Sequence, residues 1–340
     1  MHRILLGGCT SAGCTYVLSK EFRTQRPPLS PDKPGSSKAW VAVFPFLVIA
    51  VVVTVTIWKR ESIKQRPKPL AKYINMTDED EKEIYAEYQE LERNSIQYRQ
   101  SEYESEYATY DRYANITARG PWESTAVRLH GSHRQYDYIN ANEIKVIYIN
   151  LKHLNQCLLF KKKGLYNEKQ YIACQGPLEK TCEDFWEMII QYGFILFKDT
   201  NECHIYHYYF IGWSDFSVVE PQKLIELIKY INNHGRNQFD LIGKAKEALL
   251  IPTVVHCSAG VGRTGTYIAV DMIMRLIDRL KNDLSTMKLD VMGIVYQLRQ
   301  DRGKMVQTRD QYMLVNRCVE EYLRRTNRIN EGRSFCTGHM

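Results

Sequence analysis

One stretch of the chain combines a cysteine, three glycines and an arginine at a spacing that suits phosphate chemistry. It runs from Val254 to Thr266 and has the sequence VVHCSAGVGRTGT. The apolar run Ile251–Val255 predicts a buried strand before the glycines, and Tyr267–Ile277 predicts a mostly buried helix after them. A glycine turn that opens a helix binds anions through its backbone N–H groups and the helix dipole. Such a turn also stabilises a thiolate, so Cys257 is a candidate nucleophile and Arg263 a candidate phosphate ligand.

The ordinary alternative for a lone cysteine beside a glycine turn is a buried structural residue. It does not explain why His256, Cys257 and Arg263 occur at this spacing between a predicted strand and a predicted helix. The run HCSAGVGRTG closely resembles the signature of the classical protein tyrosine phosphatases. The resemblance implies that the loop backbone binds phosphate, through Ser258, Ala259, Gly260, Val261 and Gly262. It also implies that His256 supports the thiolate and that the Thr264 hydroxyl helps to release it.

The composition is that of an ordinary globular protein. The 340 residues are 44% hydrophobic and 25% charged, with a net charge of +7, and both percentages are typical of globular chains. The nine cysteines have an irregular spacing that fits neither a zinc site nor a disulfide framework. A working thiolate favours a reducing compartment. The implied chemistry needs no metal and no organic cofactor, and we expect no nucleic-acid partner.

Residues 39–58 form an uncharged stretch that predicts a transmembrane helix. A helix of this length spans a bilayer core of about 30 Å, and Trp40 and Trp58 at its ends suit the membrane interfaces. The preceding residues, 1–38, are irregular and contain several prolines, which predicts a disordered extracellular or luminal arm. A buried helix of a globular domain is the alternative, and the basic residues that follow argue against it.

Those basic residues set the predicted orientation of the helix. They are Lys59, Arg60, Lys64, Arg66, Lys68 and Lys72. Their excess over the upstream side predicts a single-pass membrane protein whose C-terminal part, including the catalytic domain, is cytoplasmic. The juxtamembrane segment, 59–84, can also contact anionic lipid. A simple stop-transfer flank is the alternative.

The resemblance to tyrosine phosphatases continues outside the signature. Glu87–Leu91 (EYQEL) resembles the short helix that opens the cytoplasmic phosphatase domain of receptor-type members. We therefore expect the phosphatase domain at 85–328 and a C-terminal tail at 329–340. Arg112–Ile116 (RYANI) resembles the phosphotyrosine loop of the family, which implies that Tyr113 stacks on the substrate ring. A tyrosine of the hydrophobic core is the alternative.

The chain departs from the family pattern in two places. An insertion is expected after Lys145, at residues 146–163, and a large deletion between Trp186 and Trp213. The implied fold is α/β, the classical tyrosine phosphatase fold with a central mixed sheet flanked by helices. Because the deletion falls where the family has several strands, we expect an incomplete sheet.

Apolar periodicity predicts further elements around these motifs. Strands are predicted at Gln191–Phe197 and His204–Ile211, and helices at Pro221–Asn233, Val291–Leu298 and Gln311–Leu323.

Two more motifs complete the implied chemistry. Trp213-Ser214-Asp215-Phe216 lies where the family has a loop that closes over bound substrate, so Asp215 is the candidate general acid. Met305–Tyr312 (MVQTRDQY) resembles the glutamine loop of the family. The resemblance implies that Gln307 positions the hydrolytic water and that Gln311 is an auxiliary substrate contact. Asp215 and Gln307 are expected to touch the substrate as well.

Together these motifs predict a receptor-type, membrane-anchored signalling phosphatase that hydrolyses phosphotyrosine in proteins through a phosphocysteine intermediate. Ser214 in place of a proline, together with the missing strands, leaves two alternatives open. One is a phosphotyrosine-binding module with little or no turnover. The other is an incomplete product that does not fold.

Overall fold

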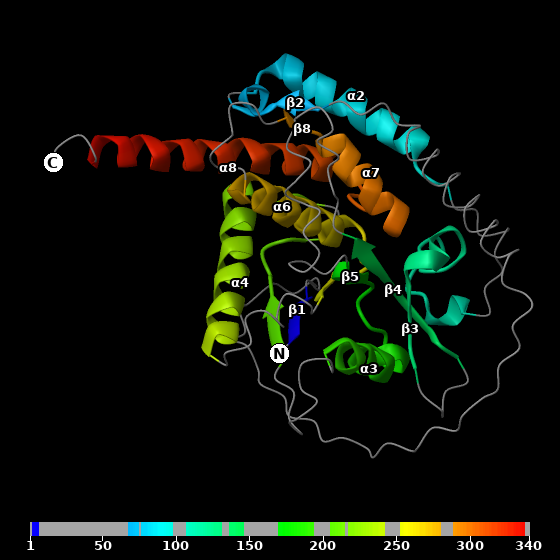
Figure 1. Cartoon of the computed structure of the whole chain (residues 1–340). Coiled ribbons are helices and arrows are strands. Elements are labelled where there is room, and N and C mark those ends of the chain that lie inside the picture. Colours follow the sequence, from blue (N-terminus) through cyan, green and yellow to red (C-terminus); the bar gives the residue numbers. More distant parts are fainter. Residues whose placement is uncertain are drawn as a thin grey trace, which may run out of the picture.

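A mixed sheet with helices on both faces forms the centre of the described structure (Figure 1). The computed structural model describes residues 2–6, 67–74, 76–97, 107–130, 136–145, 169–193, 205–214, 217–241, 252–279 and 288–336. The sheet has six strands in the order β3-β4-β5-β7-β1-β6. This arrangement confirms the prediction of an α/β fold with a central mixed sheet.

The strands of this sheet are β3 (Ala126–Arg128), β4 (Tyr138–Lys145), β5 (Lys169–Cys174), β7 (Thr253–His256), β1 (His2–Leu6) and β6 (Ile205–Tyr209). The β3–β4 and β4–β5 pairs are antiparallel, whereas β5, β7, β1 and β6 are parallel to one another. A second, two-stranded sheet pairs β2 (Lys68–Pro69) with β8 (Lys288–Leu289). Strand β6 confirms the predicted strand at His204–Ile211.

Six α-helices surround the sheet within the described residues: α2 (Asp78–Asn94), α3 (Cys182–Gly193), α4 (Pro221–Leu241), α6 (Gly262–Arg279), α7 (Val291–Asp301) and α8 (Arg309–Cys336). Short 3-10 turns occur at η1 (Leu70–Tyr73), η3 (Ala108–Tyr110), η4 (Gly120–Thr125) and η5 (Glu179–Thr181). The helices predicted from Pro221, Val291 and Gln311 are confirmed as α4, α7 and α8, each somewhat longer than predicted. The strand predicted at Gln191–Phe197 is wrong in its first three residues, which end α3; residues 194–197 lie outside the described residues.

Side chains of the central strands alternate between two hydrophobic clusters, because successive residues of a strand point to opposite faces. Tyr171 and Ala173 of β5 pack in the larger cluster with α4, α6, α7 and α8. Ile172 and Cys174 pack in the smaller one with Phe185 of α3. The strand that carries the cysteine signature, β7, is therefore covered on both faces.

The folded part of the chain begins before residue 85, the predicted start of the domain. Helix α2 begins at Asp78 because Thr77 and Asp80 form a capping box, in which each side chain accepts a hydrogen bond from the other residue's backbone N–H. Strand β2 pairs with β8, and Lys68 makes a 2.8 Å ion pair with the buried Glu87. Residues 67–84 thus belong to the folded domain, and Lys68 is engaged by protein. Helix α8 runs beyond residue 328, to Cys336.

Strand β1 corrects the prediction that all of residues 1–38 form a disordered arm. It lies between β7 and β6 and is parallel to both, with Leu6 in register with His256 and with Tyr209. Local composition could not indicate this strand, because its two partners lie some two hundred residues or more further along the chain. The sheet thus contains an interior strand, β1, that comes from outside the region of the predicted deletion.

The predicted transmembrane segment, 39–58, and the predicted insertion, 146–163, lie outside the described residues. Among the helices that the structure does describe, none combines the length and the apolar character needed to cross a bilayer.

Candidate active site

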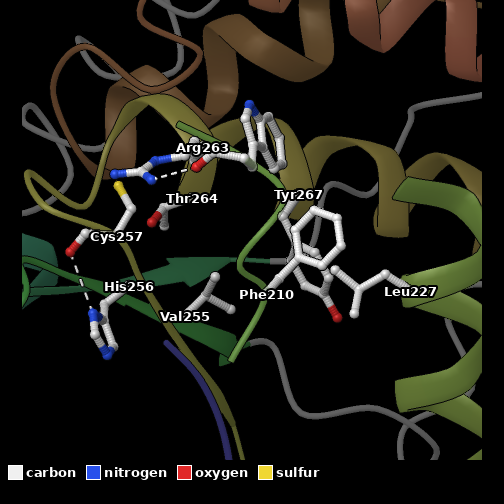
Figure 2. Close-up of a pocket in the computed structure, with 9 residues that line it drawn as sticks. Phe210, Leu227, Val255, His256, Cys257, Arg263, Thr264 and Tyr267 are labelled. Carbon is white, nitrogen blue, oxygen red and sulfur yellow. Dashed lines mark hydrogen bonds between the residues drawn. The ribbon is translucent and has the colours of Figure 1, made fainter. Parts of the chain in front are cut away.

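The glycine loop joins β7 to α6 at the end of the sheet where the parallel strands finish. Cys257 follows the last residue of β7, and α6 begins at Gly262. The backbone N–H of Gly260 donates a hydrogen bond to the Cys257 sulfur at 3.2 Å, so the loop curls around the side chain of Cys257, which is 5% exposed. Figure 2 shows the sulfur beside the guanidinium of Arg263. The predicted order of strand, glycine turn and helix is confirmed.

Two glycines allow this loop to lie against neighbouring backbone. Gly260 has φ +71, and a Cβ at this position would lie 2.1 Å from the carbonyl oxygen of Cys174 on β5. A Cβ at Gly265 would lie 2.4 Å from the backbone nitrogen of Val306. Both distances are far below van der Waals contact, so only glycine fits. The loop is therefore fixed between β5 and the turn that carries Gln307.

Arg302 supports the loop from beneath, and no local sequence feature indicated it. Its side chain is fully buried, and it donates to the carbonyls of Gly260 at 2.9 Å and Ala259 at 3.1 Å. It also donates to the side-chain oxygens of Asn142 at 2.7 Å and Asn140 at 2.6 Å, both on β4. Burial lowers the pKa of this guanidinium. The asparagines of the Asp137–Asn142 run could not be recognised from the sequence as supports of the loop, because no local feature shows that they lie near Arg302.

Arg263 links the glycine loop to the predicted acid loop. Its side chain is 6% exposed, and Nη1 donates to the carbonyl oxygen of Trp213 at 2.7 Å. The indole of Trp213 donates in turn to the carbonyl of Ser217 at 2.9 Å. Asp215 itself lies outside the described residues. Trp213 and Ser217, which lie on either side of Asp215 in the sequence, are joined by a hydrogen bond, and Trp213 accepts a hydrogen bond from Arg263.

Tyr113 lies next to the glycine loop. Its hydroxyl shares a 2.9 Å hydrogen bond with the hydroxyl of Ser258, and the residue is 40% exposed. The adjacent Arg112 fixes this segment, because its backbone N–H donates to Gln175 at 2.8 Å and its guanidinium donates to the carbonyl of Pro177 at 2.9 Å. An exposed ring held at the rim is available to stack on an aromatic ligand.

Gln307 and Gln311, the two glutamines of the predicted glutamine loop, lie side by side over Gly262 and make different contacts. A Cβ built on Gly262 would be 3.0 Å from the carboxamide of Gln311 and 3.3 Å from Oε1 of Gln307. Gln311 is 1% exposed, and its Oε1 accepts the backbone N–H groups of Gln307 at 3.0 Å and Thr308 at 3.3 Å. Its carboxamide oxygen thus shapes the turn, while Gln307 is the half-buried group above the loop.

His256 does not supply positive charge to the thiolate. Burial lowers its pKa to about 3, with smaller contributions from the charges of Arg112 and Arg263. The neutral ring points away from the sulfur, and its Nδ1 hydrogen-bonds to the carbonyl of Cys257 at 3.2 Å (Figure 2). His256 therefore contributes by orienting the backbone of Cys257 as a neutral donor.

Thr264 lies directly behind the nucleophile. Its hydroxyl is buried and has no hydrogen-bond partner within the part of the chain that the structure describes. Thr264, Cys257 and Arg263 line one small cavity of about 20 Å³, closed on its other side by apolar side chains, among them Phe210, Leu227, Val255 and Tyr267 (Figure 2). The Thr264 hydroxyl thus faces the same cavity as Cys257. Within the described residues, no three His, Cys, Asp or Glu side chains are grouped to hold a metal ion.

A buried cysteine in a glycine loop, with an arginine over it and a helix N-terminus behind it, defines a cysteine-dependent phosphatase site. The family model described as Protein-tyrosine phosphatase matches residues 108–197 and 193–321. The chain belongs to the protein-tyrosine phosphatase family, which confirms the resemblance seen in its sequence.

The chain is similar to several curated phosphatases. It is 30% identical to human receptor-type tyrosine-protein phosphatase eta over 294 residues, which are 70% of this chain and 19% of that protein. It is 29% identical to the chicken receptor-type tyrosine-protein phosphatase eta over 70% of this chain and 18% of that protein. A match to tyrosine-protein phosphatase 3 of Dictyostelium discoideum is 29% identical over 60% of this chain. The chain thus spans about a fifth of the length of the first two relatives.

We predict that Gly260→Ala destabilises the loop and removes anion binding. A side chain at φ +71 that overlaps the carbonyl of Cys174 should lower the free energy of unfolding by more than about 1 kcal/mol. Urea unfolding and calorimetric titration with inorganic phosphate measure the two effects. Gly212→Ala is the matched control, because its Cβ would meet only the Phe210 ring at 3.6 Å. Equal unfolding midpoints for the two variants would contradict this account of the loop.

We also predict that His256→Asn flattens the acid dependence of stability. The folded-state pKa of His256 is lowered from 6.5 to about 3, so the unfolded chain binds the proton first as the pH falls. The stability from the neutral ring is complete above about pH 6.5 and is lost below it, by at most about 1.4 kcal/mol per pH unit. Asparagine keeps a donor and does not titrate. Urea unfolding between about pH 4.5 and about pH 6.5 should show a smaller slope. An unchanged slope, equal to that of the exposed-site control His130→Asn, would mean that His256 is charged in the folded chain.

Proposed function

We propose that the chain is an active enzyme that hydrolyses phosphotyrosyl proteins through a phosphocysteine intermediate. The observation that carries the proposal is the 2.7 Å hydrogen bond between Arg263 and the carbonyl of Trp213. It joins Arg263, the residue that we expect to bind phosphate, to Trp213, which lies two residues before the candidate acid Asp215 in the sequence. The names of the relatives, which are receptor-type phosphatases among others, support the same activity.

In the first step, the Cys257 thiolate attacks phosphorus while the bond from phosphorus to the tyrosyl oxygen breaks. The carboxyl of Asp215 gives its proton to the departing oxygen, which leaves as a neutral tyrosine. Arg263 and the N–H groups of the loop hold the transferring phosphoryl oxygens and offset their charge. Tyr113 makes the entrance deep, so that an aromatic phosphate reaches Cys257 and a phosphoserine does not.

In the second step, water held by Gln307 attacks the phosphorus of phosphocysteine. The phosphorus–sulfur bond breaks, the electron pair returns to Cys257 as thiolate, and the water proton passes to the Asp215 carboxylate. A carboxamide suits Gln307 because it can accept from the water and donate to a phosphoryl oxygen without adding charge. The Thr264 hydroxyl donates to the departing sulfur from behind.

We predict that Cys257→Ser abolishes phosphate release from a phosphotyrosyl peptide and that Asp215→Asn lowers kcat by about 10²–10⁴-fold. Asp78→Asn, on the exposed first turn of α2, is the control for loss of one carboxylate. Turnover should be measured beside a thermal melt of each sample. Equal turnover in wild type and Asp215→Asn would indicate a phosphotyrosine-binding module. The absence of a cooperative melt in the wild type would indicate an incomplete product.

We further propose that residues 39–58 anchor the chain as a single-pass membrane protein with the catalytic domain in the cytoplasm. The support is the uncharged sequence of the segment, the basic flank, and the receptor-type description of the relatives. Of the basic residues in that flank, Lys59, Arg60, Lys64 and Arg66 are the candidates for contact with anionic lipid, at about 1 kcal/mol each.

A single pass would withdraw β1 from the sheet, because residues 2–6 and the catalytic domain would lie on opposite sides of the bilayer. We expect the free energy gained by inserting residues 39–58 into a membrane to exceed the free energy gained by pairing β1 in the sheet. The segment contains twelve Val, Ile, Leu and Phe residues, each favouring insertion by about 0.3–0.6 kcal/mol. Strand β1 gains about 0.5–1.5 kcal/mol for each hydrogen bond, but ordering each of its residues costs about 1–2 kcal/mol. We therefore expect β1 to pair only while the segment is outside a membrane.

A glycosylation reporter tests this topology. Phe22→Asn places an asparagine two residues before Thr24 and so creates an acceptor site upstream of the segment. We expect full-length chain made with microsomes to be glycosylated there, and the double variant Phe22→Asn/Thr24→Ala to be unmodified. The exposed Asn115, two residues before Thr117, is the internal control for the catalytic side and should stay unmodified. A reporter without glycan on membrane-bound chain would contradict a single pass and would leave β1 in the sheet.

A further inference from the structure

The turn that carries Gln307 is held by side chains from outside the turn. Arg299 donates from Nε to the carbonyl of Met305 and from Nη2 to the carbonyl of Val306, both at 2.9 Å. The hydroxyl of Tyr88 donates to the carbonyl of Gln307 at 2.7 Å. Three successive carbonyls of the turn are thus each fixed by a side-chain donor.

These contacts hold a backbone conformation that the turn would not adopt alone. Val306 has φ 55 and Lys304 has φ 60, in the left-handed region. This conformation is rare for a β-branched residue such as valine, because its Cβ substituents crowd the backbone. Strained residues of this kind persist when surrounding contacts fix them. The hydrogen bond from the N–H of Val306 to the carbonyl of Val261 at 3.1 Å adds a fixed point on the phosphate loop itself.

Arg299 and Tyr88 together form a clamp on the turn. Helix α2 supplies its outer part, which consists of Tyr88 and the residues that contact Arg299. Arg299, whose side chain is 2% exposed, makes a 2.6 Å ion pair with Glu92 of α2 and donates to the hydroxyl of Ser95 at 3.0 Å. Its guanidinium also lies over the ring of Tyr88, 5.5 Å from the ring centre. Helix α2 precedes residues 108–321, the part of the chain that the family model matches. The clamp therefore joins the turn to an element outside the matched domain.

The helix is itself anchored by a buried charge. Glu87 is 3% exposed and accepts a 3.0 Å hydrogen bond from the hydroxyl of Tyr312 on α8. It also pairs with Lys68 of β2 at 2.8 Å. Because Glu87 adjoins Tyr88, this anchor sets the position from which the Tyr88 hydroxyl reaches Gln307. Helix α2 is thus a fixed support and not a loosely attached leader.

We propose that Tyr88, presented by α2, is a positioning residue for Gln307 and controls the second step of the reaction. The inference rests on the proposed function. With the carbonyl of Gln307 fixed, its carboxamide stays above Gly262, where the attacking water must be held. Without the Tyr88 hydroxyl, the carbonyl loses its donor and the carboxamide is free to shift, so the water loses its orientation. Attack by Cys257 does not use Gln307, so the first step should be unaffected.

The test follows the fate of the phosphoryl group in the full-length chain. p-Nitrophenyl phosphate is the substrate, and glycerol is added as a competing acceptor. Release of p-nitrophenol reports all phosphoryl groups that reach Cys257, and inorganic phosphate reports those that pass to water. In the wild type the two products should be nearly equal. In Tyr88→Phe we expect the glycerol share to rise and hydrolysis of phosphocysteine to slow by about tenfold, a modest effect for a displaced catalytic group.

Tyr85→Phe is the matched control, since it removes the same atom from the same helix. The ring of Tyr85 contacts the guanidinium of Arg309 at 4.5 Å and makes no described contact with the turn. It should behave as wild type. In a Gln307→Ala background, Tyr88→Phe should have no further effect on the product ratio, because the group that it positions is absent.

The outcomes separate the inference from the function on which it rests. A wild type that is folded but releases no p-nitrophenol overturns the proposed function and this inference with it. A wild type that turns over, with Tyr88→Phe giving the same product ratio, overturns the positioning role alone. Equal slowing of both steps in Tyr88→Phe, or an unchanged effect in the Gln307→Ala background, would assign Tyr88 a structural role and also overturn it.

Discussion

The phosphate loop keeps its shape because a buried guanidinium, that of Arg302, binds its carbonyl groups from beneath. A buried cation is tolerated only when its donors are satisfied. Here the carbonyls of Ala259 and Gly260 and the side chains of Asn140 and Asn142 satisfy them. With these carbonyls turned down toward Arg302, the N–H groups of the loop can face the opposite side. Each hydrogen bond to a charged group of this kind contributes about 1.5–3 kcal/mol.

The same arrangement explains the charge balance of the site. Arg302 lies under the loop, Arg263 lies over it, and α6 begins within it, so positive charge converges on one small volume. Burial lowers the pKa of Arg302, so the protein environment disfavours its positive charge. An anion in the loop therefore relieves an existing electrostatic strain. It also follows that His256 is neutral, because burial and the nearby arginines disfavour a further cation.

Local sequence features predicted the parts of the site that are local. The strand, the glycine turn and the helix are encoded within Val254–Thr266, and the structure has them in that order. The capping box at Thr77 and Asp80 was present in the sequence and would have located the start of α2 correctly. Long-range supports were not predictable in this way. Arg302 and the asparagines of β4 lie about 160 residues apart in the chain.

Strand β1 was also not predictable from local sequence, because its two partner strands, β6 and β7, lie far along the chain. Strand β7, which precedes Cys257, and strand β6, which precedes Trp213, are connected in two ways. Both pair with β1, and the segments that follow them are joined by the hydrogen bond from Arg263 to Trp213. Phe210 and Trp213 are also buried in the main hydrophobic cluster. If β1 left the sheet, only the connection through β1 would be lost. The hydrogen bond from Arg263 to Trp213 does not involve β1, so the glycine loop and the segment that carries Trp213 remain joined in either state of the sheet.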